Sequence, residues 1–92
     1  MKYIDWDKDK NEQLKRERDI SFDDVINALD SGGLIEIIKN PNTKKYPNQK
    51  VFLVIINNYV YIVPFVEDDR KYFLKTIYPS RKMTKKYLVE KK

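Results

Sequence analysis

The sequence predicts an α+β fold, an antiparallel β-sheet meander with two N-terminal helices and a short C-terminal helix. Three observations predict it. Apolar residues recur at helical spacing before residue 30, they gather in short β-rich segments from residue 34 onward, and only a few residues separate most of these segments. Strands joined by short turns pair antiparallel, and helices then cover the apolar face of the sheet. At 92 residues the chain is expected to form a single domain, residues 1–92, with one core.

The N-terminal third is expected to hold a short strand and two helices. Tyr3 to Trp6 can form an edge strand, and Asp7 to Arg18 is a polar stretch of helix formers that predicts a solvated helix. Ser21 is a good N-cap for a second helix. Gly32 and Gly33 supply the positive φ that ends it. This second helix is expected to pack on the sheet through residues at i, i+3, i+4 and i+7, namely Phe22, Val25, Ile26 and Leu29.

The middle of the chain predicts three strands. Leu34 to Ile38 is the first candidate, and the polar segment Asn40 to Asn48 is expected to be a loop. Val51 to Ile56 and Tyr59 to Val66 are two β-rich runs separated by Asn57-Asn58. Both asparagines tolerate the left-handed conformation of a type I′ turn, so these runs are expected to form a hairpin.

The C-terminal part predicts a last strand and a helix. Glu67 to Arg70 is a polar turn, Tyr72 to Tyr78 is the expected strand, and Pro79 ends it. The segment from Ser80 onward is expected to be a short basic helix. Its inner face is expected to consist of Met83, Tyr87 and Leu88.

Charge is unevenly distributed along the chain. Residues 1–36 hold six basic and ten acidic side chains, whereas residues 37–92 hold thirteen basic and four acidic ones. Such a basic half attracts polyanions, of which phosphate backbones are the commonest in a cell. A lysine-rich solubilising surface explains the composition equally well, so composition leaves both interpretations open.

The chain contains no cysteine and no histidine. This excludes disulfides, thiolate metal sites, a cysteine nucleophile and the usual proton shuttle, so any catalysis must use Lys, Arg, Tyr, Ser, Thr or carboxylates. Acidic pairs such as Asp23 and Asp24 are expected to be solvated helix residues, and we expect neither a metal nor a cofactor. The charged start and the short apolar runs predict a cytoplasmic protein with no membrane segment.

Three short patterns follow one another along the chain. Trp6, Asp7 and Lys10 form a W-D-x-x-K segment; Ile20, Ser21 and Phe22 match the end of a K-H-G-[hydrophobic]-[polar]-F motif; and Arg81, Lys82 and Thr84 match I-S-A-R-[RK]-A-T. In order and spacing they resemble the BrnT family of the RelE superfamily, toxins of type II toxin–antitoxin systems. The differences are Arg18 and Asp19 in place of His-Gly, Gln49 and Lys50 in place of a Glu-Arg pair, and Tyr78, Pro79, Ser80 and Met83 within the last motif.

The resemblance implies a RelE-like fold and a ribonuclease activity that inhibits translation. It also implies a BrnA-like ribbon-helix-helix antitoxin as partner. Promoter DNA would be bound only through the complex with that antitoxin. Whether the chain forms a homodimer or a hetero-oligomer stays open.

Metal-free RNA cleavage needs a base for the 2′-hydroxyl, cations for the pentavalent phosphate and an acid for the leaving 5′-oxygen. Arg81 is the first catalytic candidate, because a guanidinium grips phosphate through two donors and because it matches the closing motif. Lys82 beside it is expected to contact the RNA backbone. Thr84, also a catalytic candidate, is expected either to bind phosphate or to cap the last helix.

Lys75 is the second catalytic candidate because of its place in the expected strand. There it would share a face with Phe73 and Ile77, while Tyr72, Leu74, Thr76 and Tyr78 would occupy the other face. A lysine on an otherwise apolar face either reaches to water or belongs to a site. Tyr78 is expected to stack on a base. Arg70 and Lys50 complete the expected RNA-binding set, although charges beside a turn are often simply solvated.

Three functions therefore remain open from the sequence. The first is an RNA-cleaving toxin with its site near Lys75 and Arg81. The second is a non-catalytic RNA- or DNA-binding module that uses the same basic face. The third is an antitoxin-interaction module, a degenerate toxin, which the altered motifs would favour.

Overall fold

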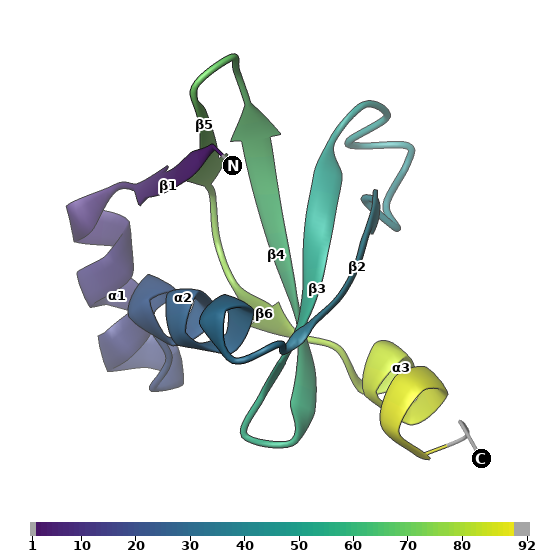
Figure 1. Ribbon diagram of the computed structural model, residues 1–92. Helices are drawn as coiled ribbons and strands as arrows, with labels where there is room; N and C mark the ends of the chain where they lie inside the picture. Colours follow the sequence, from purple (N-terminus) through teal and green to yellow (C-terminus); the bar gives the residue numbers. More distant parts are fainter. Residues whose placement is uncertain (1, 90–92) are drawn as a thin grey trace.

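The computed structural model describes residues 2–89 and confirms the α+β fold (Figure 1). A six-stranded sheet has the order β1-β5-β4-β3-β2, with β6 also beside β4. All pairs are antiparallel except β1 with β5, which is parallel. The strands are β1 (Tyr3–Trp6), β2 (Leu34–Lys39), β3 (Lys50–Ile56), β4 (Tyr59–Glu67), β5 (Lys71–Leu74) and β6 (Tyr78–Pro79). The helices are α1 (Lys8–Arg18), α2 (Phe22–Asp30) and α3 (Arg81–Thr84), which continues as the π-helical turn η1 (Lys85–Val89).

Within residues 2–89, none of the helices combines the length and the hydropathy needed to cross a bilayer.

Both N-terminal helices begin at a capping side chain, of which Ser21 was predicted and Asp7 was not. The Asp7 side chain accepts a hydrogen bond from the backbone at the start of α1, and Ser21 forms a reciprocal capping box with Asp24 at the start of α2. The polar helix α1 is held by two buried side chains, Leu14 and Asn11. Asn11 Oδ1 accepts a hydrogen bond of 2.7 Å from the backbone N–H of Phe22, which docks α1 against the start of α2.

The predicted hairpin turn and the end of α2 depend on residues in the left-handed backbone conformation, with positive φ. Asn57 and Asn58 have φ values of 52° and 62°, as a type I′ turn requires. Gly32 has φ of 83°, but Gly33 does not share this conformation, so the expectation of positive φ at both glycines was wrong. Gly33 is needed for a different reason, because a Cβ there would lie 3.0 Å from the carbonyl oxygens of Ala28 and Ile55.

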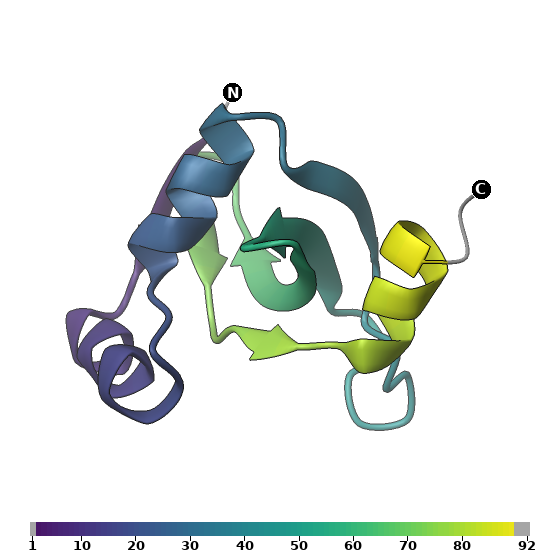
Figure 2. The same ribbon diagram turned by 90° about the horizontal axis from the view of Figure 1, so that it is seen from below.

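The sheet has an apolar cluster on each face, so the expectation of one core was wrong. Figure 2 shows α1 and α2 on one side of the sheet and α3 on the other. The six residues Val51–Ile56 are all apolar, and alternate ones contribute to opposite clusters, which is the pattern of a strand covered on both faces. The cluster beneath α2 includes Phe22, Val25, Phe52, Val54, Phe65, Leu74 and Ile77. The cluster beneath α3 includes Val51, Leu53, Val60, Ile62, Tyr78 and Met83.

The expected strand Tyr72 to Tyr78 is interrupted, and this prediction was wrong. Leu74 pairs with Phe65 and Tyr78 pairs with Ile62, so three residues, 75–77, lie opposite two residues of β4, 63–64. This is a β-bulge, and Pro64 explains its position. Proline has no N–H to donate to the neighbouring strand, and its carbonyl accepts one hydrogen bond of 2.8 Å from the N–H of Lys75.

The bulge changes the faces to which the side chains belong. Phe73 and Lys75 follow the normal alternation, but the extra residue sends Ile77 into the cluster beneath α2, where it joins Leu74. Tyr78 then lies in the opposite cluster, beneath α3. The predicted grouping of Lys75 with Ile77, and of Tyr78 with Leu74, was therefore wrong.

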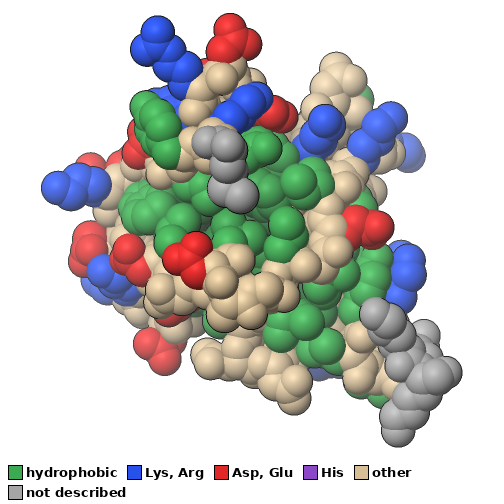
Figure 3. All heavy atoms as spheres, viewed as in Figure 1, with side chains coloured by type: hydrophobic (Ala, Val, Ile, Leu, Met, Phe, Trp, Pro, Cys, Tyr) green, Lys and Arg blue, Asp and Glu red, His purple; other side chains and the backbone are tan. Residues whose placement is uncertain are grey.

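An apolar groove of about 200 Å³ opens on the α2 side of the sheet. Figure 3 shows hydrophobic side chains gathered over this side of the molecule, with both basic and acidic side chains around them. Leu34 and Ile37 of the edge strand β2 are 40% and 43% exposed there. The groove is lined by Ile4, Ile26, Leu29, Asp30, Leu34, Ile37, Phe52 and Tyr72.

Candidate functional site

A pocket of about 180 Å³ forms where the bulge meets the loop between β2 and β3. We call it the tyrosine–lysine pocket, because one ammonium group and two phenols are the functional groups with acid–base chemistry that line it. The bulge contributes Lys75 and Thr76, and the loop contributes Tyr46. The full lining is Asn40, Tyr46, Gln49, Pro64, Lys75, Thr76 and Tyr78.

The bulge is what brings Lys75 and Tyr78 into one pocket. In an unbroken strand these two residues, three apart, would point to opposite faces. The inserted residue restores them to the same side. Lys75 is exposed, and its Nζ lies 5.5 Å from the centre of the Phe73 ring, which holds the ammonium over the same face. Lys75 and Tyr78, both predicted site residues, are thus neighbours because of the bulge, which strand alternation did not predict.

Tyr78 stays protonated over a wider pH range than an ordinary tyrosine. Burial in the sheet raises its pKa above the usual value of 10.0, and the nearby Tyr46 phenol raises it further. Tyr46 itself is 38% exposed. The pocket therefore offers a half-buried phenol that keeps its proton at neutral pH, beside a phenol open to solvent and an ammonium group.

A buried amide supports the loop side of the pocket. Asn40 is 2% exposed, and its Nδ2 donates a hydrogen bond of 2.8 Å to Gln49 Oε1. The backbone of Asn40 also donates to the Gln49 carbonyl, at 2.7 Å. Gln49 is thereby held at the start of β3, where it lines the tyrosine–lysine pocket.

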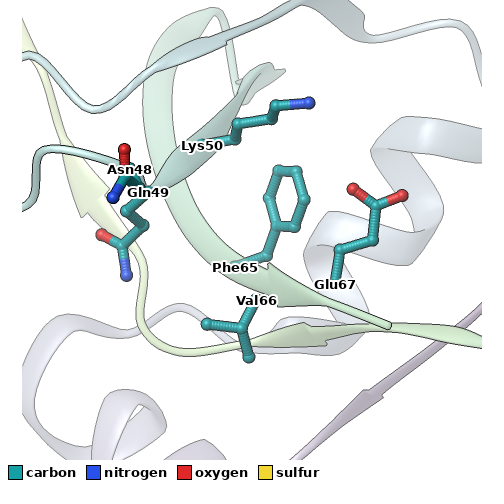
Figure 4. A pocket seen from close by; sticks show the side chains of 6 residues that line it. All are labelled: Asn48, Gln49, Lys50, Phe65, Val66 and Glu67. Atoms are coloured by element: carbon teal, nitrogen blue, oxygen red, sulfur yellow. The ribbon is translucent and has the colours of Figure 1, made fainter. Parts of the chain in front are cut away.

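A second and larger cavity, of about 320 Å³, shares Gln49 with the first. We call it the outer pocket. In Figure 4, Lys50, Phe65 and Glu67 project to one side of the strands, whereas Gln49 and Val66 project to the other. The Glu67 carboxylate accepts a hydrogen bond from Lys2. The lining is Asn48, Gln49, Lys50, Phe65, Val66 and Glu67.

Arg81, the first catalytic candidate, does not line the tyrosine–lysine pocket. It begins α3, three residues after Tyr78, and is exposed, as is Lys82. Arg70 lies in the turn between β4 and β5 and lines neither pocket. The structure therefore brings Lys75 and Tyr78 together and puts Lys50 in the adjoining outer pocket, but it leaves the other basic candidates outside.

The Thr84 hydroxyl is engaged inside the protein. It donates a hydrogen bond of 2.7 Å to the carbonyl of Ser80 and accepts one of 2.9 Å from the N–H of Val60. The helix N-cap is Ser80, whose Oγ accepts from Met83 N at 3.1 Å. Because its single proton is already used, we leave Thr84 out of the site proposed below.

Arg18 stands where the BrnT-like motif has a histidine, and its side chain contacts the backbone of the bulge that carries Lys75. Its Nη1 donates a hydrogen bond to the carbonyl of Ile77, the buried residue of the bulge. Helix α1 is thereby joined to the segment that carries Lys75. This is a structural role that a long cationic side chain can perform from the end of a helix.

Sequence reasoning missed five of the seven lining residues of the tyrosine–lysine pocket, four of them polar. Tyr46 lies within the segment Asn40 to Asn48, which was predicted only as a polar loop. One signal was present in the sequence, because a proline within an otherwise continuous strand, Pro64, indicates a bulge, and bulges often lie beside functional sites. The missed residues with polar side chains are Asn40, Tyr46, Gln49 and Thr76.

Comparisons of the chain with protein-family models, with curated proteins and with solved structures each gave no significant match. The resemblance to the BrnT family therefore stays a prediction from the residues. Within residues 2–89, no cluster of three or more acidic side chains is arranged to hold a metal ion.

Proposed function

We propose that this protein is an RNA-cleaving toxin whose reaction takes place in the tyrosine–lysine pocket. The observation that carries the proposal is the meeting of Lys75, Tyr46 and Tyr78 in one cavity, on a sheet face formed by the basic part of the chain. The BrnT-like motifs supply the reaction class. Chemistry based on lysine and tyrosine is also the kind that a chain without histidine or cysteine can perform.

The proposed reaction breaks the bond between phosphorus and the 5′-oxygen. The 2′-oxygen attacks the phosphorus while its proton passes to water, and the products are a 2′,3′-cyclic phosphate and a 5′-hydroxyl. Lys75 stabilises the negative charge that grows on the phosphate oxygens. Tyr78 gives its proton to the leaving 5′-oxygen and regains one from water, and its raised pKa keeps it protonated beforehand.

The other residues assist binding in this proposal. Tyr46 is exposed enough for a base to stack on its ring. Arg81 and Lys82, on α3 beyond Tyr78, hold a neighbouring phosphate, and Lys50 attracts the strand from the outer pocket. The Arg81 assignment changes here from catalysis to binding, because Arg81 does not line the pocket.

The test is cleavage of single-stranded RNA by the purified chain in the presence of EDTA, with analysis of the product ends. We expect cyclic-phosphate and 5′-hydroxyl ends, and a loss of rate of about 100-fold in both Lys75→Ala and Tyr78→Phe. Lys15→Ala is the matched control, since Lys15 lies on α1 and pairs with Glu12. Intact RNA after incubation with wild-type protein, together with normal growth of cells that express it alone, would contradict the proposal.

A second candidate function is RNA binding without cleavage. It is favoured by the fact that, among the residues described, Lys75 is the single basic side chain that lines the tyrosine–lysine pocket. One ammonium group is sufficient to bind a phosphate but gives less charge stabilisation than a lysine–arginine pair. Tight binding of RNA that is recovered uncut would support this function in place of the first.

The proposed toxin also needs an antitoxin, and we propose that it packs on the apolar groove. Lys39 and Lys50 are paired directly across β2 and β3, two residues beyond Ile37 and Phe52 of the groove. Two like charges in such a pair repel each other, so the groove fits an amphipathic segment that carries carboxylates at one end. Ile37→Asp should abolish co-purification with a small protein encoded beside this one and leave RNA cleavage intact. Retained co-purification would contradict this assignment.

A further inference from the structure

The side-chain amide of Gln49 stands at the wall that the tyrosine–lysine pocket and the outer pocket share. A carboxamide has two different ends, an oxygen that accepts hydrogen bonds and a nitrogen that donates two. The end that faces the pockets decides which chemical groups this wall can recognise.

A chain of hydrogen bonds fixes that orientation. The backbone N–H of Asn42 can only donate, and it donates to Asn40 Oδ1 at 2.9 Å. The other end of the buried Asn40 amide, Nδ2, must therefore be the donor, and it donates to Gln49 Oε1 at 2.8 Å. The Gln49 oxygen is thus occupied. Its Nε2 is the end left for a ligand, because no acceptor in the described part of the chain is hydrogen-bonded to it.

The surroundings of Gln49 fit a nucleobase. Val66 projects to the same side of the strands (Figure 4) and is 50% exposed, so it offers an apolar surface next to a hydrogen-bond donor. An aromatic base has the same combination, an apolar face and polar edges. The outer pocket, at about 320 Å³, is within the range of small-molecule sites.

We propose that Gln49 reads the base of the nucleotide next to the one held in the tyrosine–lysine pocket, and that it prefers a keto base. Nε2 donates to O4 of uracil or O6 of guanine, while the base packs on Val66. Cytosine and adenine carry an amino group at the corresponding position, which would meet Nε2 donor to donor. The inference rests on the proposed RNA binding and adds the substrate preference of the site.

Asn40 acts as a positioning residue in this proposal. In Asn40→Asp the carboxylate still accepts from Asn42 N–H, but it can no longer donate to Gln49. The Gln49 amide is then expected to turn and donate Nε2 to Asp, which presents Oε1 to the pockets. The same glutamine would then prefer amino bases, an effect that a merely structural role of Asn40 would not produce.

The experiment compares two hexanucleotides, all-uridine and all-cytidine, with 2′-fluoro sugars that prevent cleavage. The bases have the same size and differ at position 4 in keto against amino groups. Wild-type protein is expected to bind the uridine hexamer about three- to tenfold more tightly, as one hydrogen bond gives. Gln49→Ala should bind both equally, and Asn40→Asp should reverse the preference. Gln13→Ala, which removes a side-chain amide on α1 that donates to Glu17, should keep this preference.

The possible outcomes separate the inference from the proposed function. Equal binding of the two hexamers by wild type, an unchanged preference in Gln49→Ala, or an equal loss for both hexamers in that variant would overturn the inference while RNA binding stands. If wild type binds neither hexamer, the proposed function fails and the inference with it. If Asn40→Asp does not fold, as judged by circular dichroism, Gln49→Glu replaces it, because a carboxylate also presents an acceptor and should reverse the ratio.

Discussion

Replacement of Ile77 with alanine tests the β-bulge on which the candidate site depends. Ile77 is 0% exposed and packs beneath α2 beside Leu74. Shortening a fully buried isoleucine to alanine costs about 2–5 kcal/mol, since apolar contacts are lost and a cavity remains. A domain of this size is stable by about 5–14 kcal/mol, so the variant should fold but lose a large fraction of its stability.

The assay is urea denaturation, followed by the fluorescence of Trp6, whose ring centre lies 5.5 Å from that of Phe22. We expect a lower midpoint with an unchanged slope for Ile77→Ala. Thr76→Ala is the control, and it should cost less than about 1 kcal/mol because Thr76 is half-buried at the pocket. In an unbroken strand Thr76 would face the cluster beneath α2 and Ile77 would lie on the opposite face, with Phe73 and Lys75. A loss below about 0.5 kcal/mol for Ile77→Ala would contradict the burial of Ile77 beneath α2, and with it the bulge.

Three further predictions concern stability. The pKa of Asp5 in the folded protein is lowered, mainly by the hydrogen bond from Lys71. The Asp5 carboxylate therefore stabilises the fold at pH values above its unfolded pKa of about 4. This stabilisation is lost as the pH falls through the lower pKa of the folded state. Asp5→Asn should accordingly flatten the acid end of the stability–pH curve measured with urea, and an unchanged acid limb would contradict it. Thr84→Val should lower the free energy of unfolding by about 1–3 kcal/mol, because the Val60 N–H loses its hydrogen-bond partner and the Ser80 carbonyl loses one of two; a melting temperature equal to that of wild type would show that those bonds do not matter. Gly33→Ala should cost about 1–3 kcal/mol through contacts of 3.0 Å with two carbonyl oxygens, and a denaturation midpoint at or above the wild-type value would show that the backbone yields easily there.

The elements that depend on local signals could be predicted from the sequence. The capping box at Ser21 and the two asparagines of the hairpin each fix a conformation within a few residues. The predicted ends of β2, β3 and β4 lie within one residue of the ends in the structure. These features need no knowledge of distant contacts.

The candidate site depends on contacts between distant parts of the chain, and alternation along one strand could not predict it. Whether Lys75 and Tyr78 share a face is decided by Pro64, more than ten residues earlier in the sequence, which the expected strand pattern treated as an ordinary residue. The Asn40–Gln49 pair depends on how the loop between β2 and β3 closes. Arg81 shows a different error, because its match to the closing motif put it in one site with Lys75, and it does not line the pocket that holds Lys75.

The most direct test of the central claim, that RNA occupies the tyrosine–lysine pocket, is an NMR titration of the ¹⁵N-labelled protein with the uncleavable uridine hexamer. The backbone amide signals of Gln49, Lys75 and Tyr78 should shift together and saturate at one ligand concentration, while those of α1 stay in place. Shifts confined to the apolar groove or to α1, with the three pocket signals unmoved, would contradict the claim.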